Sequence, residues 1–260
     1  MTLETTILHG GGFIEWRCGS GFGAREPLRI APDDLRLSFE PPLPRLRLQH
    51  KAGGTLLWPA PRAARVVPGR AGAADLALPA LPAHHVRSVV VDVSGRYLPR
   101  AFDLSLGAAT QQSIALYASP LGTRYGTAGG VQGRLAFADG TPAAWALLEL
   151  TVTPTLGGPL QFIAQADQHG EFRLALDRLP ALTRDAPAPS YSAKLSVRAS
   201  AGALATRPLD PAALTPVSIA KGRNAQGKSQ FASTLSLDIT PGTVRPVTSP
   251  KHELIVLKAD

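Results

Sequence analysis

Hydrophobic and polar residues alternate one by one over many short stretches of the chain, and this period of two predicts β-strands. The clearest case lies near residue 195, where Leu195 and Val197 alternate with Lys194 and Ser196. Strands are expected wherever such runs lie between turn residues: 35–39, 46–48, 86–93, 96–106, 114–117, 131–138, 146–153, 160–166, 171–176, 191–199, 231–239 and 252–257. Frequent turns between short strands are typical of an antiparallel β-sandwich.

Glycine and proline separate these runs and exclude long helices. The 260 residues include 25 Gly and 24 Pro, and a proline inside a helix costs roughly 3 kcal/mol. We expect a proline-rich loop from Gly53 to about Pro82 and an exposed polar loop at 221–228. One helical turn is predicted at 210–214, because a capping Asp210 precedes a proline at the first helical position.

The elements together predict an all-β protein with two antiparallel β-sandwich-like domains, proline- and glycine-rich loops and a flexible N-terminal arm. Residues 1–30 are rich in glycine and are expected to form the arm. Residues 31–125 are predicted to form an N-terminal β-domain. Residues 126–260 are predicted to form a second sandwich, which the C-terminal strands complete and in whose second strand Trp145 is a core residue.

The second predicted domain carries a characteristic set of turn residues. Its segments are a strand with Gly133, the turn Asp139-Gly140-Thr141-Pro142, an apolar strand from Trp145 to Val152, a turn with Asp167, Gly170 and Phe172, and a strand from Tyr191. Aspartate accepts hydrogen bonds within its own turn, and glycine adopts a positive φ without strain. Over 131–199 the pattern resembles the carboxypeptidase-regulatory-like family of transthyretin-like β-sandwiches. The resemblance implies a non-catalytic accessory or adhesive module.

The wider arrangement has a resemblance of its own. Residues 95–104, then 116–120, then the second sandwich are similar to proteins encoded with bacterial contractile injection systems and phage-tail-like particles. This resemblance implies a non-enzymatic structural or assembly component that binds other protein subunits. Such a component would be cytoplasmic during assembly and particle-associated afterwards.

Charge is concentrated in one part of the chain. The net charge is +8, and residues 36–70 contain seven Arg and Lys residues but one acidic residue, Glu40. The predicted partner-binding residues are Arg36, Arg45, Arg47, Lys51, Trp58, Arg62, Arg65 and Arg70. Such a surface suits an acidic face of a neighbouring subunit, and Trp58 either packs on its own domain or inserts into that partner. Nucleic acid is not expected, because the stretch has no reader motif and few aromatic residues for stacking.

Glycine-rich and cysteine motifs give no catalytic site. A single cysteine, Cys18, excludes an intramolecular disulfide and a multi-cysteine metal site. His9-Gly10-Gly11-Gly12-Phe13 has the letters of an esterase oxyanion loop, but no Gly-x-Ser-x-Gly elbow accompanies it. Residues 19–24 do not have the glycine spacing of a dinucleotide-binding loop.

Two pairs of titratable residues are also considered: His84 and His85 are interpreted as surface histidines, and Asp167 and His169 as structural. His84 and His85 are adjacent on a strand, so their side chains point to opposite faces. Asp167 and His169 lie in one predicted turn, and no third group that could orient them is evident. We therefore expect no metal, no cofactor and no enzymatic activity.

Two other classes of protein stay open as alternatives. A cell-surface or carbohydrate-binding module would need exposed aromatic residues, and 3 Trp, 4 Tyr and 8 Phe leave few after two cores are filled. An enzyme with a site assembled from scattered residues is the second alternative. We expect no secretory signal at residues 1–10, and no membrane span, because polar residues and Pro120 interrupt the uncharged stretch 104–123.

Overall fold

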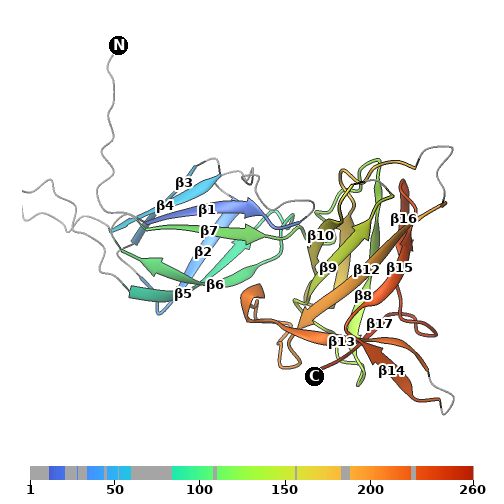
Figure 1. The fold of residues 1–260 in the computed structure, drawn as a ribbon. Helices are drawn as coiled ribbons and strands as arrows, with labels where there is room; N and C mark the ends of the chain where they lie inside the picture. Colours follow the sequence, from blue (N-terminus) through green and yellow to red (C-terminus); the bar gives the residue numbers. More distant parts are fainter. Residues whose placement is uncertain are drawn as a thin grey trace, which may run out of the picture. The chain divides into compact units, whose positions relative to one another are not determined.

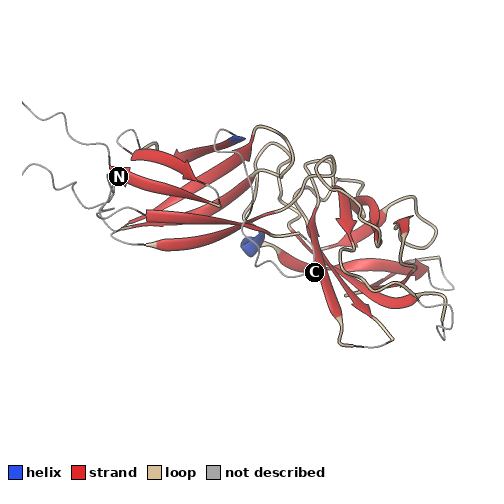
Figure 2. Ribbon diagram, turned by 90° about the horizontal axis from the view of Figure 1, so that it is seen from above, coloured by secondary structure: helices blue, strands red, loops and turns tan. Residues whose placement is uncertain are grey.

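The computed structural model describes residues 12–20, 28, 34–43, 46–51, 53–59, 84–107, 110–155, 157–182, 188–223 and 227–259. These residues contain 17 strands, which Figures 1 and 2 show as arrows grouped into sheets. Helix in the described residues is confined to short 3-10 turns such as η3 (Pro211–Ala213). The predicted all-β class is therefore confirmed. Most of the predicted N-terminal arm, including residues 1–11, lies outside the described residues.

Contacts divide the chain into two compact units. The first unit comprises Met1–Arg17, Pro27–Val90 and Ala101–Ile114, and the second comprises Cys18–Glu26, Val91–Arg100 and Ala115–Asp260. The domain boundaries predicted from the sequence stay predictions.

Two sheets contain the strands of the first unit. Their orders are β3-β4-β1-β7 and β2-β5-β6. The bounds are β1 (Gly12–Cys18), β2 (Leu35–Glu40), β3 (Leu46–Lys51), β4 (Gly54–Pro59), β5 (His84–Asp92), β6 (Arg100–Leu106) and β7 (Gln111–Leu116). β4 lies between β3 and β1 and runs antiparallel to both.

Alternation along the strands produces the core of the first unit. Ile14 and Trp16 are buried on β1 (0% and 2% exposed), and the residue between them is only half-buried. The Trp16 ring meets the ring of Phe102 edge to face, with centroids 6.1 Å apart and planes at 84°. The two sheets thus pack through the side chains that the period of two places inward.

A buried hydroxyl satisfies the one polar atom of the Trp16 side chain. Trp16 Nε1 donates a hydrogen bond of 2.8 Å to Thr55 Oγ1, and His50 Nδ1 lies 2.7 Å from the same oxygen. Thr55 itself is 0% exposed. A buried donor that loses its acceptor keeps the full cost of its desolvation. Thr55 therefore allows a tryptophan to occupy this core.

We expect Thr55→Val to lower the free energy of unfolding of the first unit by about 1–3 kcal/mol, because Trp16 Nε1 would be buried without an acceptor. Valine keeps the shape and β-propensity of threonine. Urea unfolding followed by tryptophan fluorescence measures the change. Thr153→Val, at an exposed position of the second unit, is the matched control and should change stability by less than about 0.5 kcal/mol. Equal effects of the two substitutions would contradict the role given to Thr55.

Two expectations about this part of the chain are corrected. The loop predicted from Gly53 contains β4, which pairs with β3 from Lys51↔Gly54 to Leu46↔Pro59. Gly53, at φ +81°, makes the tight turn that the pairing requires. Residues 12–18, which were predicted to belong to the flexible N-terminal arm, form β1, which pairs with β4 and contributes Ile14 and Trp16 to the core.

One long sheet makes up most of the second unit. Its order is β10-β9-β12-β13-β17-β8-β11, with β14, β15 and β16 paired to β13, β12 and β8. The bounds are β8 (Gly129–Phe137), β9 (Leu147–Thr153), β10 (Leu160–Gln165), β11 (Glu171–Ala175), β12 (Tyr191–Ala199), β13 (Thr215–Arg223), β14 (Ser229–Ala232), β15 (Leu235–Ile239), β16 (Thr243–Pro246) and β17 (Ile255–Lys258). The end strands β10 and β11 contact each other, so the sheet curls into a half-barrel. β16 and β17 run parallel to β8, whereas β11 runs antiparallel to it.

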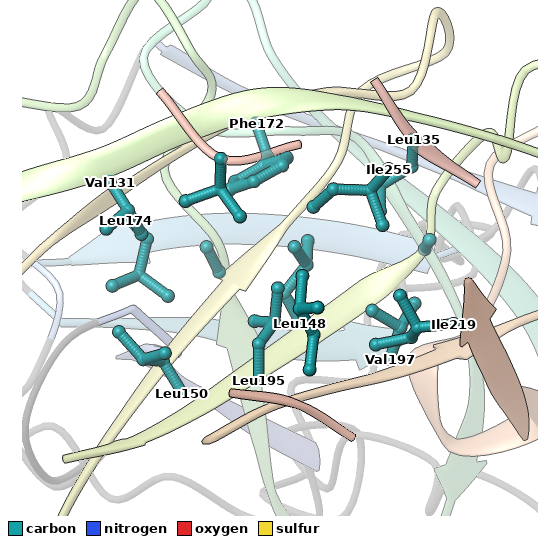
Figure 3. Packing of buried hydrophobic residues seen from close by; sticks show 14 of the residues in the cluster. Val131, Leu135, Leu148, Leu150, Phe172, Leu174, Leu195, Val197, Ile219 and Ile255 are labelled. Carbon is teal, nitrogen blue, oxygen red and sulfur yellow. The ribbon is translucent and has the colours of Figure 1, made fainter. Parts of the chain in front are cut away.

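The curled sheet encloses the larger core of the protein. Figure 3 shows Leu148, Leu150 and Leu195 facing Val131 and Leu174 across its interior. The two aromatic residues of the sequence pattern are also buried, Phe172 at 1% and Tyr191 at 6% exposure.

The two predicted turns of this unit, which begin at Asp139 and Asp167, are confirmed. Asp139 Oδ1 accepts the backbone N–H of Thr141 at 2.9 Å, which lowers the pKa of the carboxyl below its ordinary value. Asp167 Oδ1 accepts the N–H groups of both His169 and Glu171 at 2.8 and 2.9 Å. These bonds give Asp167 the structural role expected of it.

Other expectations for the second unit are corrected. The run 231–239 forms two strands, β14 and β15, which pair with different partners. β13 was not predicted, because Pro216 and the polar residues after 220 hide its alternation. Trp145 precedes β9, and it packs with Leu98 and Ala144 in a small cluster separate from the main core. The predicted turn at 210–214 is present as η3, and Asp210 caps it by accepting from Ala212 N.

Candidate protein-interaction surface

The structure brings together three of the predicted partner-binding residues. Arg47 and Lys51 lie on β3 with exposed side chains, and half-buried Trp58 lies directly opposite Arg47 on β4. Arg36 is exposed on β2, in the other sheet of the unit. The remaining predicted residues, Arg45, Arg62, Arg65 and Arg70, lie outside the described residues.

Apolar side chains lie beside these cations on the outer face of the β3-β4-β1 sheet. Phe13, Leu56 and Trp58 are half-buried, and Phe13 pairs with Leu56 across β1 and β4. The Phe13 ring covers Gly54, where an added Cβ would collide with it. We call these three side chains the apolar strip. Phe13 and Leu56 were not predicted, because only the register of β4 with β3 and β1 places them beside Trp58.

The charge around the apolar strip is positive. Arg47 and Lys51 flank it on β3 with Gln49 between them. On β1, Arg17 forms an ion pair of 2.8 Å with Glu15, so Glu15 is already compensated. An apolar patch with arginine and aromatic side chains has the composition of a protein interface. Its positive rim favours an acidic partner and would be screened by salt.

The other candidate residues are distributed over separate places. His85 is exposed, with Nδ1 3.1 Å from Ser105 Oγ, and the side chain of His84 lies outside the described residues. Cys18 Sγ donates to Ser20 O at 3.4 Å. In the glycine-rich motifs, residues 9–11 and 21–24 also lie outside that part of the chain. Within the described ranges, no group of three or more His, Cys, Asp or Glu residues could hold a metal ion.

A hollow of about 810 Å³ lies within the second unit and was not predicted. Arg134 and Arg173 line it from the outer faces of β8 and β11, beside Glu171 and Tyr97. Glu171 is the cross-strand partner of Arg134, and the lining also includes Asp92, Asp167 and Glu253, so charges of both signs lie there. The hollow therefore does not have the one-sided charge of the β3-β4-β1 face.

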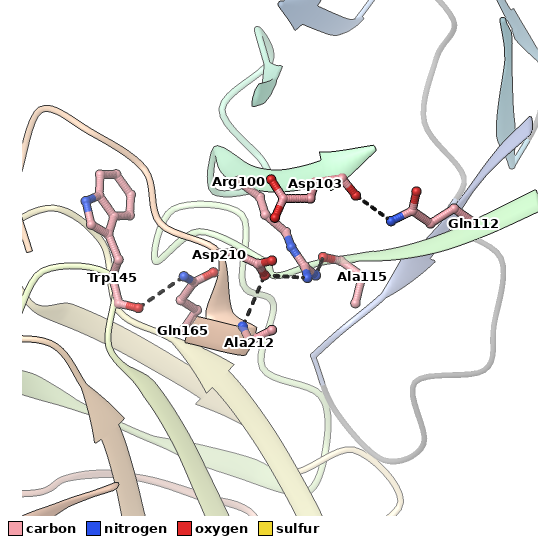
Figure 4. A network of polar contacts seen from close by, with 8 residues as sticks. All are labelled: Arg100, Asp103, Gln112, Ala115, Trp145, Gln165, Asp210 and Ala212. Carbon is pink, nitrogen blue, oxygen red and sulfur yellow. Dashed lines mark hydrogen bonds and ion pairs between the residues drawn. The ribbon is translucent and has the colours of Figure 1, made fainter. Parts of the chain in front are cut away.

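Figure 4 draws polar contacts, among them those of Arg100, Asp210 and Gln165 in the second unit. Arg100 Nη2 contacts Asp210 Oδ1 at 3.0 Å, and Arg100 Nη1 donates to Ala115 O at 2.6 Å. Buried Gln165 donates from Nε2 to Trp145 O at 3.1 Å. Burial raises the pKa of the nearby Tyr117 phenol, although Arg100 partly opposes the increase. These bonds tie loops to strands and are interpreted as structural.

Comparisons of the chain with known proteins show no family for it. No family profile matches the chain, and no curated protein matches it in sequence. Among solved structures, a leucine-rich repeat protein from Bacteroides thetaiotaomicron VPI-5482 is similar with a TM-score of 0.21 and 11% identity. That similarity covers 95% of this chain and 26% of the other, so the chain spans about a quarter of that protein's length. Separately, none of the described residues forms a helix long and apolar enough to cross a membrane.

Proposed function

We propose that the chain is a non-enzymatic structural or assembly component of a phage-tail-like or contractile injection particle, and that it works through protein–protein contacts. In this proposal the apolar strip and its flanking cations, Arg47 and Lys51, bind an acidic surface of a neighbouring subunit. The second sandwich is proposed to be a carboxypeptidase-regulatory-like accessory module. The protein would be assembled in the cytoplasm and then held in the particle.

The observation that carries the proposal is the composition of the outer face of β3, β4 and β1. Phe13, Leu56 and Trp58 offer apolar area that is only half-buried within the unit. Interface energy is concentrated in a few aromatic and arginine side chains. Positive residues at the rim add selectivity for acidic partners and speed their association. This combination supports binding to a protein surface.

The proposal predicts the effect of reversing the charge of this face. Particles are purified from native cells that carry either the wild-type chain or Arg47→Glu/Lys51→Glu, and copies per particle are counted by quantitative mass spectrometry. We expect occupancy to fall by roughly tenfold or more, because like charges would then face each other across the contact. Absence of the wild-type chain from purified particles would refute the proposed function.

The other sheet of the first unit supplies a matched control. Arg36→Glu/Arg87→Glu changes the net charge by the same amount, at exposed positions of β2 and β5. Occupancy of this variant should stay within about twofold of wild type, because a contact at the β3-β4-β1 face is largely screened from distant charges. An equal loss in both variants would show that total charge, rather than this face, determines binding.

A further inference from the structure

Among the described residues β3 is an edge strand, and the register shows which of its backbone N–H and C=O groups point away from β4. Trp16 N donates to Gly53 O at 2.9 Å, so the odd-numbered residues of β4 exchange hydrogen bonds with β1. The even-numbered residues of β4 therefore face β3. Their partners, from Lys51↔Gly54 to Arg47↔Trp58, are the odd-numbered residues of β3. The backbone groups of its even-numbered residues point away from β4.

Leu48 lies at the middle of this outward-pointing row. Among the described residues β3 pairs with β4 alone, and no hydrogen bond of the Leu48 N–H or C=O is found there. The N–H of Leu46 is used locally, because it donates to Leu43 O at 3.0 Å. β3 contains no proline. An edge of this kind can pair with a further strand.

The charges on β3 determine which kind of incoming strand could pair with its edge. Arg47 and Lys51 point to the same face, four residues apart. If two copies of β3 paired antiparallel about Gln49, Arg47 of each copy would lie opposite Lys51 of the other. Like charges directly opposite each other are destabilising. The edge is therefore protected against its own copy and open to a strand of opposite charge.

We propose that β3 accepts an extended acidic strand from a neighbouring protein subunit, which extends the sheet by one strand. The incoming strand has Glu or Asp at two positions four residues apart, opposite Arg47 and Lys51. Both cations would lie in non-hydrogen-bonded pairs, where cross-strand side chains are closest. This inference rests on the proposed function and specifies how the partner binds.

A synthetic peptide, Val-Glu-Val-Thr-Val-Glu-Val, is the probe, and the same peptide with Lys in place of both Glu residues is its control. Binding to the full chain is measured by calorimetry. Hydrogen exchange of the Leu48 amide is measured with and without peptide. We expect the acidic peptide to bind at least tenfold more tightly than its control and to slow exchange at Leu48. Equal affinity of the two peptides, or unchanged exchange at Leu48, would overturn the proposal.

A pair of variants separates backbone pairing from side-chain packing. Leu48→Pro removes the outward N–H without breaking a β3-β4 hydrogen bond, and Leu48→Ala loses the side chain but keeps the N–H. We expect the proline variant to bind the acidic peptide at least tenfold more weakly than the alanine variant. Equal affinity in two folded variants would refute edge pairing, and exchange at Leu48 in the wild type decides the matter if Leu48→Pro does not fold.

The outcomes also distinguish this inference from the proposed function. Suppose that charge reversal removes the chain from the particle but the proline and alanine variants bind the acidic peptide equally well. The β3-β4-β1 face is then the binding surface, and the proposal of edge pairing is wrong. If the acidic peptide pairs with β3 but the chain is absent from particles, the edge is correct and the particle assignment is wrong. A concentration-dependent dimer of the free chain that Leu48→Pro abolishes would show a second copy on the edge, and would overturn the choice of an acidic partner.

Discussion

Replacing Gly170 with alanine is expected to lower the free energy of unfolding of the second unit by about 3–4 kcal/mol. Gly170 has φ +77°, a conformation that L side chains rarely adopt. A Cβ added there would collide with the carbonyl oxygen of Leu135. That carbonyl belongs to the backbone of β8, and the N–H of Leu135 donates a hydrogen bond of 2.8 Å to Gly170 O. The collision can therefore be relieved only by moving the turn away from the strand.

Gly140 provides the matched control in the turn that begins at Asp139. Its φ is +87°, but an added Cβ would meet no atom within 4 Å. Gly140→Ala should therefore cost only the backbone strain, about 1 kcal/mol. Urea unfolding monitored by hydrogen exchange of β12 amides measures both variants. Similar losses in both would show that steric contact with Leu135 contributes nothing.

The difference between these two glycines shows what the sequence could and could not predict. Both turns were predicted, because an aspartate before a glycine specifies a turn through local hydrogen bonds and a positive φ. Strand β12 was predicted with its bounds, because alternation over nine residues is also local. The close approach of Gly170 to Leu135 joins residues far apart in the chain, and nothing in the local sequence encodes it.

The pairing of strands within the sheets could not be predicted from the sequence either, because it also joins residues that are far apart in the chain. The run 231–239 has apolar residues in both of its halves, but the two halves pair with β13 and β12. β16 and β17, which lie near the C-terminus, both pair in parallel with β8, more than 100 residues earlier in the chain. Which strands meet depends on the burial available across the whole sheet, and single strands do not carry that information.

The candidate surface was predictable only in part. The local excess of cations indicated Arg47 and Lys51, and Trp58 was included as an aromatic residue within the same stretch. The register of the β3-β4 hairpin places the three side chains together. The same excess also indicated Arg36, which lies in the other sheet. Phe13 reaches the surface from a strand distant in sequence, β1. The basic run in the sequence thus indicated that the surface is positively charged, but it did not show which residues make up the surface.

Asp210→Ala is the second substitution for which we expect a large effect, a loss of about 3 kcal/mol in the free energy of unfolding of the second unit. Asp210 Oδ1 accepts from Ala212 N at 3.1 Å and from Arg100 Nη2 at 3.0 Å. Loss of the cap costs about 1 kcal/mol. The Arg100 side chain is only 13% exposed, and a cation left unpaired at that depth costs roughly 2 kcal/mol more.

Two further variants divide this loss between the cap and the ion pair. Asp210→Asn keeps an acceptor oxygen for both bonds and loses the charge, so it should cost about 1 kcal/mol. Arg100→Met/Asp210→Ala should cost less than the sum of its single substitutions by about 1–2 kcal/mol, because it leaves no cation stranded. Urea unfolding of these chains and of the two single variants gives the coupling. Strict additivity would mean that Arg100 reaches water when Asp210 is lost, and that the cap alone accounts for the contribution of Asp210.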